Sequence, residues 1–397
     1  MVRDQSSTST TPTGVSFHPE TIYRTREKGD NWCITWAADG SQVTSMDDGD
    51  WLGSRVGGEN RRGFHNRLYR ISGESNDFDR EELNGYPDLA GPEGNWFGYG
   101  IVAVDDVLYS VVSRPPGEAW SGPFRGTKLL RSADNGHSWA RVDRHGAQRP
   151  LGPEEAARNL DDAAEMFTLE EFGRPHVQQP AYPFSFVDFV QHGCNNAQAP
   201  DDYLYIYSPE GAQAHQLLLA RVHKEQLGQR DAWQYYSGAA GDGPAWTPDI
   251  QQRQPVLVLP EQSSTGDYFG WYSWLPSVVW NQGLGLYIMV NGGTYAGHGL
   301  TTCDEDYYDK WMHTKTGSLG FWYARNPWGP WNEICYTDYW TADDPGNLTY
   351  QPKLSPKWIS QDGRKMVLIW SDAMKDEEGR SHTVNYTWNQ MEITIDC

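Results

Sequence analysis

The sequence lacks the marks of several large classes of protein. No apolar run approaches the ~18–20 residues that a helix needs to span a bilayer. No P-loop, GxSxG, HExxH or dinucleotide-binding motif occurs. The five cysteines are odd in number and include no CxxC pair, so one or two disulfides are compatible with them but their pairing is open. Nucleotide-binding, serine-hydrolase, zinc-protease and redox functions therefore have no support.

Positive charge is also scarce. The chain has 32 Lys and Arg against 53 Asp and Glu, which gives a formal net charge of −21. The negative electrostatic potential of such a chain repels nucleic acid and anionic membranes, so we expect neither as a partner. It also favours a neutral glycan over a polyanionic one as the ligand.

The first residues do not have the pattern of a signal peptide, so we expect either a mature terminus with an added Met or the start of a protein that stays inside the cell. Residues 1–15 are polar and rich in Ser and Thr, which predicts a flexible segment followed by one domain over 16–397. Two N-glycosylation sequons, Asn347-Leu-Thr and Asn385-Tyr-Thr, favour a secreted, extracellular protein. We expect a monomer.

Aromatic residues and turn formers are abundant, with 19 Trp, 22 Tyr, 41 Gly and 24 Pro. Short runs rich in Val, Ile, Tyr and Trp recur, with Asp-Gly, Asn-Gly or other glycine turns between many of them. They lie at 32–37, 42–46, 100–104, 107–112, 128–131, 203–207, 216–222, 277–280, 286–290, 319–324, 365–369 and 391–395. This pattern predicts an all-β fold. The exception is 153–172, whose Ala, Glu, Leu and Met predict a short helical insertion.

One turn motif narrows the fold to a β-propeller. The segment from Ser132 to Trp139 fits the Asp-box pattern S-x-D-x-G-x-x-W, in which the Asp carboxylate binds turn amides and the Trp packs beneath. This structural hairpin is found at the outer turns of propeller blades. Ser360-Gln-Asp362-Gly363 is a weaker copy of it. The length of the chain suits about five or six blades.

The opening of the domain resembles a known family. The segment from Gly29 to Gly40, Gly-Asp-Asn-Trp-Cys-Ile-Thr-Trp-Ala-Ala-Asp-Gly, and then Asp48-Gly49 resemble the start of the domain of unknown function 4185. Further matching segments follow in order at 189–193, 202–207, 219–222, 327–331 and 357–363. The chain departs from the family at Cys194 and Asn195 and in the insertion.

Part of that family is similar to glycoside hydrolase family 183. Its members are five-bladed propellers that cleave D-arabinan internally, with inversion, by means of two aspartates. The resemblance therefore implies a single five-bladed catalytic propeller in which Asp30 and Asp48 are the catalytic residues.

These two aspartates lie on the arms of one predicted hairpin. Strands 32–37 and 42–46 meet at Asp39-Gly40, which places Asp30 and Asp48 at the open end. A three-residue loop would make them face each other, and a two-residue loop would point them to opposite faces. An inverting pair lies about 6.5–9.5 Å apart, so a facing pair would need a bulge or splayed ends. Which aspartate is the acid stays open, and Asp47 and Asp50 are the nearest alternatives.

Other side chains are candidates for binding the substrate. Asp188 and His192 fall on one face of a predicted strand and could line a central pocket, although a core histidine is the simpler reading. Tryptophan faces suit sugar C–H groups, and a locally basic stretch at 57–67 could bend over the active face. The set of substrate-binding candidates is Asn31, Trp36, Trp51, His65, Asp188, His192, Trp274 and Asn291.

No metal or cofactor is expected to be required for the reaction. The acidic cluster from Asp47 to Asp50 could hold a structural Ca²⁺ ion, but its spacing does not match an EF-hand loop.

The sequence thus predicts a metal-independent glycoside hydrolase that acts on a neutral furanoside polysaccharide such as D-arabinan or arabinogalactan, with inversion. One alternative is a polysaccharide lyase for a uronate-bearing glycan, with a His or Tyr base such as His192 or His65 and a neutralising Arg from Arg61, Arg62 and Arg67. A second alternative is a non-catalytic carbohydrate-binding propeller, which would need repeated equivalent sugar sites that the sequence does not show.

Overall fold

The computed structural model describes most of the 397 residues. The described residues are 11–53, 64–87, 89–91, 94–114, 125–152, 166–167, 183–184, 186–210, 215–241, 243–266, 275–292, 317–372 and 385–397. Trp274, Cys303, Arg61, Arg62 and nearly all of the predicted insertion at 153–172 lie outside them.

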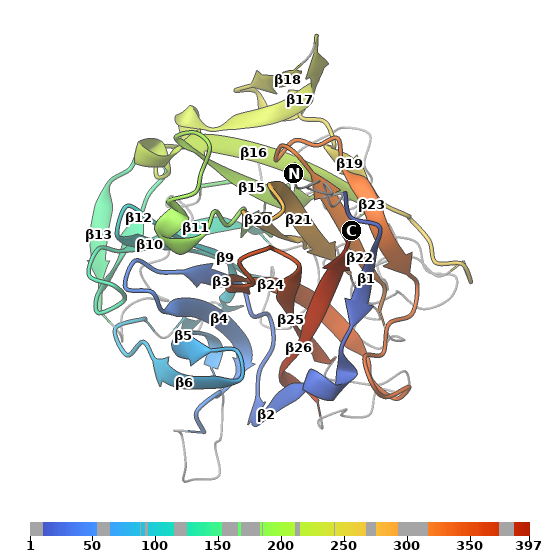
Figure 1. The fold of residues 1–397 in the computed structure, drawn as a ribbon. Helices are drawn as coiled ribbons and strands as arrows, with labels where there is room; N and C mark the ends of the chain where they lie inside the picture. Colours follow the sequence, from blue (N-terminus) through green and yellow to red (C-terminus); the bar gives the residue numbers. More distant parts are fainter. Residues whose placement is uncertain are drawn as a thin grey trace, which may run out of the picture.

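Five antiparallel sheets surround a central axis (Figure 1). Blade I contains β3 (Ile34–Trp36), β4 (Gln42–Gly49), β5 (Phe64–Glu74) and β6 (Asp77–Glu82). Blade II contains β9 (Phe97–Val104), β10 (Val107–Arg114), β11 (Arg125–Ser132), β12 (Trp139–Val142) and β13 (Gln148–Leu151). Blade III contains β14 (Asp188–Phe189), β15 (Tyr203–Pro209), β16 (Gln216–His223), β17 (Gln234–Ala240) and β18 (Gly243–Thr247), with β19 (Leu257–Val258) beside β16.

The last two blades complete the ring. Blade IV contains β20 (Ser277–Asn281), β21 (Leu286–Asn291), β22 (Leu319–Ala324) and β23 (Asn332–Thr337). Blade V contains β24 (Thr349–Ile359), β25 (Lys365–Asp372), β26 (Thr387–Asp396), β1 (Gly14–Phe17) and β2 (Tyr23–Lys28). Outside the blades lie the short hairpin β7 (Ala90–Gly91) and β8 (Gly94–Asn95), and the 3₁₀ turns η1 (Pro19–Thr21), η4 (Cys194–Asn196), η5 (Lys224–Gln226), η6 (Arg230–Ala232) and η7 (Ile250–Gln252).

The first strand of each blade lines the axis. These inner strands pack in a closed circle, β3 on β9, β9 on β14, β14 on β20, β20 on β24, and β24 back on β3. The predicted five-bladed all-β propeller is confirmed, and each of the twelve predicted strand runs lies in or overlaps an observed strand.

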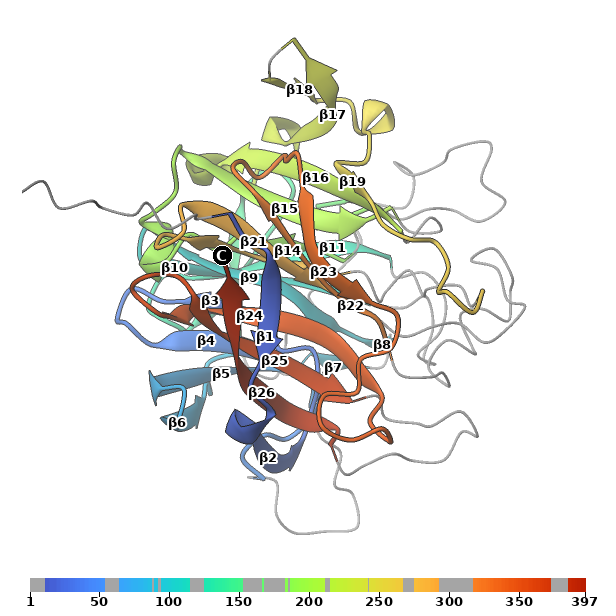
Figure 2. The same cartoon turned by 45° about the vertical axis from the view of Figure 1, so that its right-hand side comes forward.

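The two ends of the chain close the ring in one sheet. β1 pairs antiparallel with β26, from Gly14 opposite Asp396 to Phe17 opposite Ile393, and the two strands lie side by side in Figure 2. Since β1 begins at Gly14, the last residues of the segment predicted to be flexible belong to blade V.

The Asp-box forms the turn between β11 and β12 of blade II. Oδ1 of Asp134 accepts hydrogen bonds from the Ser132 hydroxyl and the Ser138 amide, each 2.8 Å long. The Trp139 ring is buried, and its Nε1 donates to the carbonyl of Gly136 at 3.2 Å. The motif is therefore structural, as predicted.

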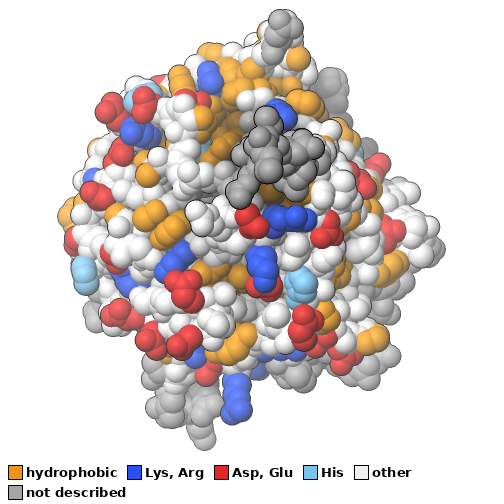
Figure 3. Space-filling model, in the orientation of Figure 1, with side chains coloured by type: hydrophobic (Ala, Val, Ile, Leu, Met, Phe, Trp, Pro, Cys, Tyr) orange, Lys and Arg blue, Asp and Glu red, His pale blue; other side chains and the backbone are white. Residues whose placement is uncertain are grey.

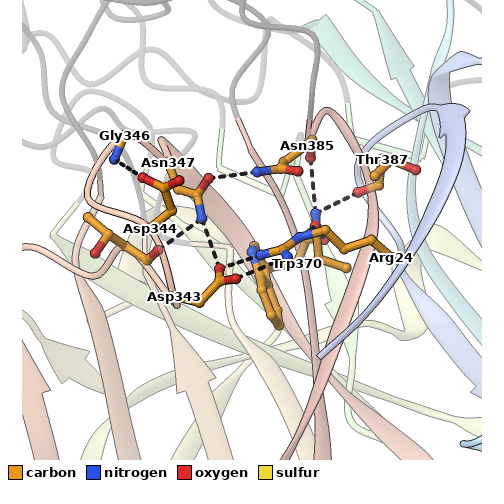
Figure 4. A network of polar contacts seen from close by, with 10 residues as sticks. Arg24, Asp343, Asp344, Gly346, Asn347, Trp370, Asn385 and Thr387 are labelled. Carbon is orange, nitrogen blue, oxygen red and sulfur yellow. Dashed lines mark hydrogen bonds and ion pairs between the residues drawn. The ribbon is translucent and has the colours of Figure 1, made fainter. Parts of the chain in front are cut away.

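A polar network ties the N-terminal part of blade V to the loop before β24 (Figure 4). Arg24 binds both carboxylate oxygens of Asp343, and Asp343 accepts a hydrogen bond from Nδ2 of Asn347 at 3.2 Å. Oδ1 of Asn347 in turn accepts from Nδ2 of Asn385 at 2.7 Å. The asparagines of the two sequons are thus partners of each other.

We expect correctly folded protein from a glycosylating host to carry no glycan on Asn347. Its side chain is 2% exposed, and its Nδ2 donates to both Thr341 and Asp343. Mass spectrometry of the Asn347 peptide, before and after glycosidase treatment, tests this. A glycan on Asn347 in folded protein would contradict the observed network.

Asp372, at the end of β25, is expected to make stability depend on pH. Burial raises the pKa of Asp372 to about 7, although the positive charge of Arg24 acts to lower that pKa. Between about pH 4 and pH 7 the folded state keeps a proton that the unfolded state has already lost. The protonated Asp372 therefore adds to the free energy of unfolding below about pH 4, and this contribution is lost as the pH rises through 7. Asp372→Asn removes this loss, which is about 4 kcal/mol by pH 8.

Urea unfolding at pH 5 and pH 8 measures this effect. We expect the decline in stability from pH 5 to pH 8 to be smaller in Asp372→Asn than in the wild type, and unchanged in Asp77→Asn, a change at an exposed aspartate. Equal declines in the wild type and Asp372→Asn would mean that Asp372 is not the group responsible.

Among the described residues, no helix is long and apolar enough to cross a membrane. Acidic and basic side chains are intermixed over the visible, non-grey face of Figure 3.

Candidate active site at the mouth of the axis

The loop of the first hairpin has the three-residue length that places Asp30 and Asp48 on one side. Trp36 pairs with Gln42, and the Ala37 amide donates to the Ser41 carbonyl at 2.8 Å, which leaves residues 38–40 as the loop. The directions of the side chains at the open end therefore depend on how the strand pairing continues before β3.

A bulge changes that pairing. Asp30 forms an antiparallel bridge with Asp47, through backbone hydrogen bonds of 3.0 and 2.9 Å, and not with Asp48. The extra residue lies near Asn31, whose φ of 54° is in the left-handed region. Of the two alternatives for the loop, the three-residue loop is observed, but the bulge prevents Asp30 and Asp48 from facing each other directly, because a β-bulge sets two residues of one strand against one of the other.

Asp30 is more enclosed than Asp48, the other predicted catalytic residue. Its side chain is buried, and Oδ2 accepts a hydrogen bond from the Tyr350 hydroxyl of β24. Oδ1 has no hydrogen-bond partner of normal geometry within the described part of the chain. Burial, followed by the neighbouring Asp48 carboxylate, raises the pKa of Asp30 well above its usual range, although Tyr350 and Tyr386 lower it.

Asp48 has a different environment from Asp30. Its side chain is 24% exposed, and its Oδ1 lies 3.1 Å from Nδ1 of His65 in β5. Burial raises the pKa of Asp48, and the hydrogen bond and charge of His65 lower it. His65 packs edge-on against Phe97, with ring centroids 5.9 Å apart, so its ring is held beside Asp48.

Asp47 is held on both oxygens by amide donors. Oδ2 accepts from Nδ2 of Asn31 at 2.8 Å, and Oδ1 accepts from Nδ2 of Asn66 at 2.8 Å and the Gly98 amide at 3.0 Å. Burial and the charge of Asp30 raise the pKa of Asp47 well above its usual range. Asp47 is therefore a fixed neighbour of Asp30 whose own protonated form is favoured by the charge of Asp30.

Asn31 joins three blades at this point. Its amide donates to Oε1 of Gln351 at 2.8 Å, and its Nδ2 also donates to the Gly98 carbonyl at 2.6 Å. Because its side chain is fully buried and used in these contacts, Asn31 positions the aspartates and does not present a free amide to substrate, which corrects its assignment as a binding residue. Asn31, Asp48 and Gln351 all have φ values near +50°, and such strained residues cluster at functional sites.

Asp188 lies deeper on the axis, in a buried ion pair. Its Oδ2 is 3.1 Å from Nζ of Lys353, and the two side chains are 7% and 1% exposed. The pair connects β14 of blade III to β24 of blade V. Burial raises the pKa of the adjacent Cys33 thiol to about 12.

Two predicted binding residues are core residues. Trp51 is fully buried and stacks on Trp388, with ring centroids 4.9 Å apart, so it has no face for a sugar. His192 is 1% exposed, with its ring nitrogens 3.1 Å from Asn196 Oδ1 and 3.0 Å from the Tyr287 hydroxyl. Burial lowers the pKa of His192 to about 4, so it is the neutral core histidine of the alternative reading.

Trp36 and Asn291 lie at opposite ends of the axis. Trp36 closes β3 at the end far from Asp30, roughly 20 Å of extended chain away, so the two cannot contact one sugar. Asn291 ends β21, which runs antiparallel to inner strand β20, so it lies toward the end where the inner strands begin. Its amide is buried, and neither polar atom has a partner among the described residues.

The structure adds residues that the sequence patterns did not indicate. Tyr350, Tyr386 and Lys353 reach the axis from blade V, more than 300 positions after Asp30 in the chain. No local motif marks them. The sequence showed Asp47 as part of an acidic turn, but only the bulge in the structure reveals that its backbone pairs with Asp30.

The described residues form neither a metal cluster nor a disulfide. Within the described ranges, no group of three or more His, Cys, Asp or Glu side chains is placed to hold a metal ion. The four described cysteines, Cys33, Cys194, Cys335 and Cys397, are free thiols.

Comparison with solved structures finds a similar fold in one protein and a weaker likeness in a second. A protein of Bacteroides ovatus ATCC 8483, described provisionally as a hydrolase, is 13% identical with a TM-score of 0.50, over 94% of this chain and 87% of its own. The α-L-arabinofuranosidase PaAbf62A of Podospora anserina, in complex with cellotriose, is 9% identical with a TM-score of 0.47, over 97% and 99%. At these identities the likeness is one of fold alone.

Comparison with protein families gives one assignment. No curated protein matches the chain. The resemblance to the domain of unknown function 4185 is not shown by these comparisons and stays a prediction. A model of a different family, the domain of unknown function DUF5005, matches residues 158–362, about half of the chain. The chain therefore belongs to the DUF5005 family.

Proposed function

We propose that this protein is a glycoside hydrolase in which Asp30 is the general acid and Asp48 the general base. The observation that carries the proposal is the pair itself. Two interacting carboxylates lie at the end of the axis where the inner strands begin. One is buried, with an oxygen that has no hydrogen-bond partner of normal geometry among the described residues, and the other is partly exposed beside a histidine. Glycoside hydrolysis needs such a pair, and environments that separate two pKa values separate the acid from the base.

The roles follow from the two environments. Asp30 holds its proton because it is buried and lies near the Asp48 carboxylate, and Tyr350 occupies Oδ2, so the proton would reside on Oδ1. Asp48 has solvent access and the support of His65 for its charged form. Asp30 would protonate the leaving oxygen, and Asp48 would take a proton from the attacking water.

The finer features of the proposal come from the family resemblance and the charge. They are a neutral furanoside polymer such as D-arabinan or arabinogalactan, inversion at the anomeric carbon, no required metal, and action outside the cell. The net charge of −21 agrees with a neutral polymer. Fold likeness does not decide the substrate, because one fold carries many chemistries.

The lyase alternative loses two of its candidate residues. His192 is buried and neutral, and Arg67 is bound to Glu82 at 2.5 Å and to the carbonyl of Tyr86. Neither is available to a uronate in this arrangement. His65 remains, but it is engaged with Asp48.

Digestion of a glycan panel tests the function. Wild type and Asp48→Asn are incubated with arabinan, arabinogalactan and a uronic-acid polymer, and reducing ends and ultraviolet-absorbing unsaturated products are followed. New reducing ends without such absorbance, lost in Asp48→Asn, would support the hydrolase. Unsaturated products would indicate a lyase, and a variant with wild-type activity would remove Asp48 from the mechanism. NMR of the first-formed anomer distinguishes inversion from retention.

A further inference from the structure

The end of the axis opposite Asp30 holds a pocket. It has a volume of about 590 Å³ and is lined by Trp36, Gly193, Gln198, Trp280, Gln282, Gly283, Pro356, Lys357, Ile359, Ser360 and Gln361. These residues come from the distal parts of inner strands β3, β20 and β24 and from the turns that follow, together with the segment after β14. The volume lies within the usual range for small-ligand sites, about 300–1,000 Å³.

The pocket is separate from the candidate active site. Tyr350 near the start of β24 contacts Asp30, whereas Pro356 and Lys357 near its end line the pocket. The intervening strand spans roughly 20 Å. A ligand in this pocket therefore does not touch the carboxylates.

Two tryptophans give the pocket its character. Trp36 and Trp280 are both partly exposed and reach the pocket from blades I and IV. Nε1 of Trp36 donates to the carbonyl of Gly40 at 3.2 Å, and the Trp280 ring packs on Tyr287 with centroids 4.9 Å apart. Both rings are therefore held in place before a ligand arrives, which lowers the entropy cost of binding.

Polar groups around the tryptophans complete the site. Three glutamines, Gln198, Gln282 and Gln361, line it, and no other described residue forms a hydrogen bond with their side-chain amides. The lining residues include no Asp or Glu and one cation, Lys357, whose Nζ donates to the carbonyl of Gly73 at 3.0 Å. Apolar ring faces and uncharged amides that both donate and accept match the C–H faces and hydroxyls of a sugar.

We propose that this pocket is a second, non-catalytic carbohydrate-binding site that takes a neutral glycan chain. Trp36 and Trp280 contact the sugar faces, and the three glutamines bind its hydroxyls. The site does not depend on the proposed hydrolysis, since no catalytic carboxylate takes part. It would hold the protein on a polymer while the opposite mouth of the axis remains open to a chain.

Affinity electrophoresis tests the proposal. Native gels containing arabinan, arabinogalactan or xyloglucan are run with the full chain, and retardation is measured against polymer concentration. We expect the wild type to be retarded by at least one of these neutral polymers. We expect Trp280→Ala to weaken the interaction about tenfold, and Gln282→Ala with Gln361→Ala to weaken it measurably.

Controls keep the outcome decisive. Gln282 and Gln361 are exposed, so their replacement should leave the fold intact even if Trp280→Ala unfolds the protein. Trp246→Ala removes another partly exposed tryptophan, on β18 and outside the pocket, and should keep the retardation. No retardation of the wild type, or retardation that persists in both Trp280→Ala and the double glutamine variant, would overturn the proposal. Asp48→Asn should still be retarded, so this test can succeed where hydrolysis fails.

Discussion

Asp30→Asn is expected to lower kcat by about 10²–10⁴-fold while the protein stays folded. The amide keeps the size of the carboxyl and can still accept the hydrogen bond from Tyr350, but it cannot transfer a proton to the leaving oxygen. A substrate with an acidic leaving group, such as a nitrophenyl glycoside, needs less help from an acid. The loss should therefore be much smaller on that substrate than on a polysaccharide.

Asp48→Asn is the matched variant, and it should behave differently. It removes the base, so activity should fall on both substrates, and azide, which attacks without a base, should restore turnover with a glycosyl azide as product. Asp50→Asn is the control, since Asp50 lies two residues away and outside the acid–base pair. If azide restores Asp30→Asn and not Asp48→Asn, the two roles must be exchanged.

The same assignment fixes the direction of the pH profile. Activity requires Asp30 protonated and Asp48 ionised, so the rate should fall at low pH as Asp48 gains a proton and at high pH as Asp30 loses its own. Because the pKa of Asp30 is raised well above its usual range, the high-pH limb belongs to Asp30. That limb should be absent from the residual activity of Asp30→Asn on the activated substrate.

Lys353→Met should cost about 3–5 kcal/mol of unfolding free energy. The change leaves the Asp188 carboxylate buried without its cation. The free-energy cost of an unpaired buried charge is much larger than the net stabilisation that the ion pair provides. The double variant Lys353→Met with Asp188→Leu removes both charges and should recover most of the loss. Urea unfolding of the wild type, the single variant and the double variant measures the difference.

An exposed ion pair provides the control for this result. Lys365 and Glu392 lie 2.8 Å apart with side chains 60% and 35% exposed, so water already solvates both charges. Lys365→Met should change stability little. A Lys353→Met variant as stable as Lys365→Met would show that the axis is more hydrated than its burial implies.

Local patterns were enough to predict the fold class and the position of the first hairpin, whereas the proposed catalytic role of its aspartates came from the family resemblance. The Asp-box depends on contacts within eight residues, from Ser132 to Trp139, so its residues can be recognised without the rest of the chain. The loop at Asp39-Gly40 is equally local. The strand runs were visible because each needs only a few apolar and aromatic residues in succession.

The tertiary structure alone decided how the site is assembled. The bulge that sets Asp30 against Asp47 is held by Gln351, 320 positions along the chain, and Tyr350 reaches Asp30 over the same separation. The residue type of Trp36 made it a candidate for contacting a sugar beside the aspartates. The direction of β3 instead places it at the opposite end of the axis, in the pocket that Trp280 also lines. Strand periodicity determines the face of the sheet on which a side chain lies. The closing of the ring of blades determines which residues contact that side chain. That closure joins residues hundreds of positions apart, which no local pattern records.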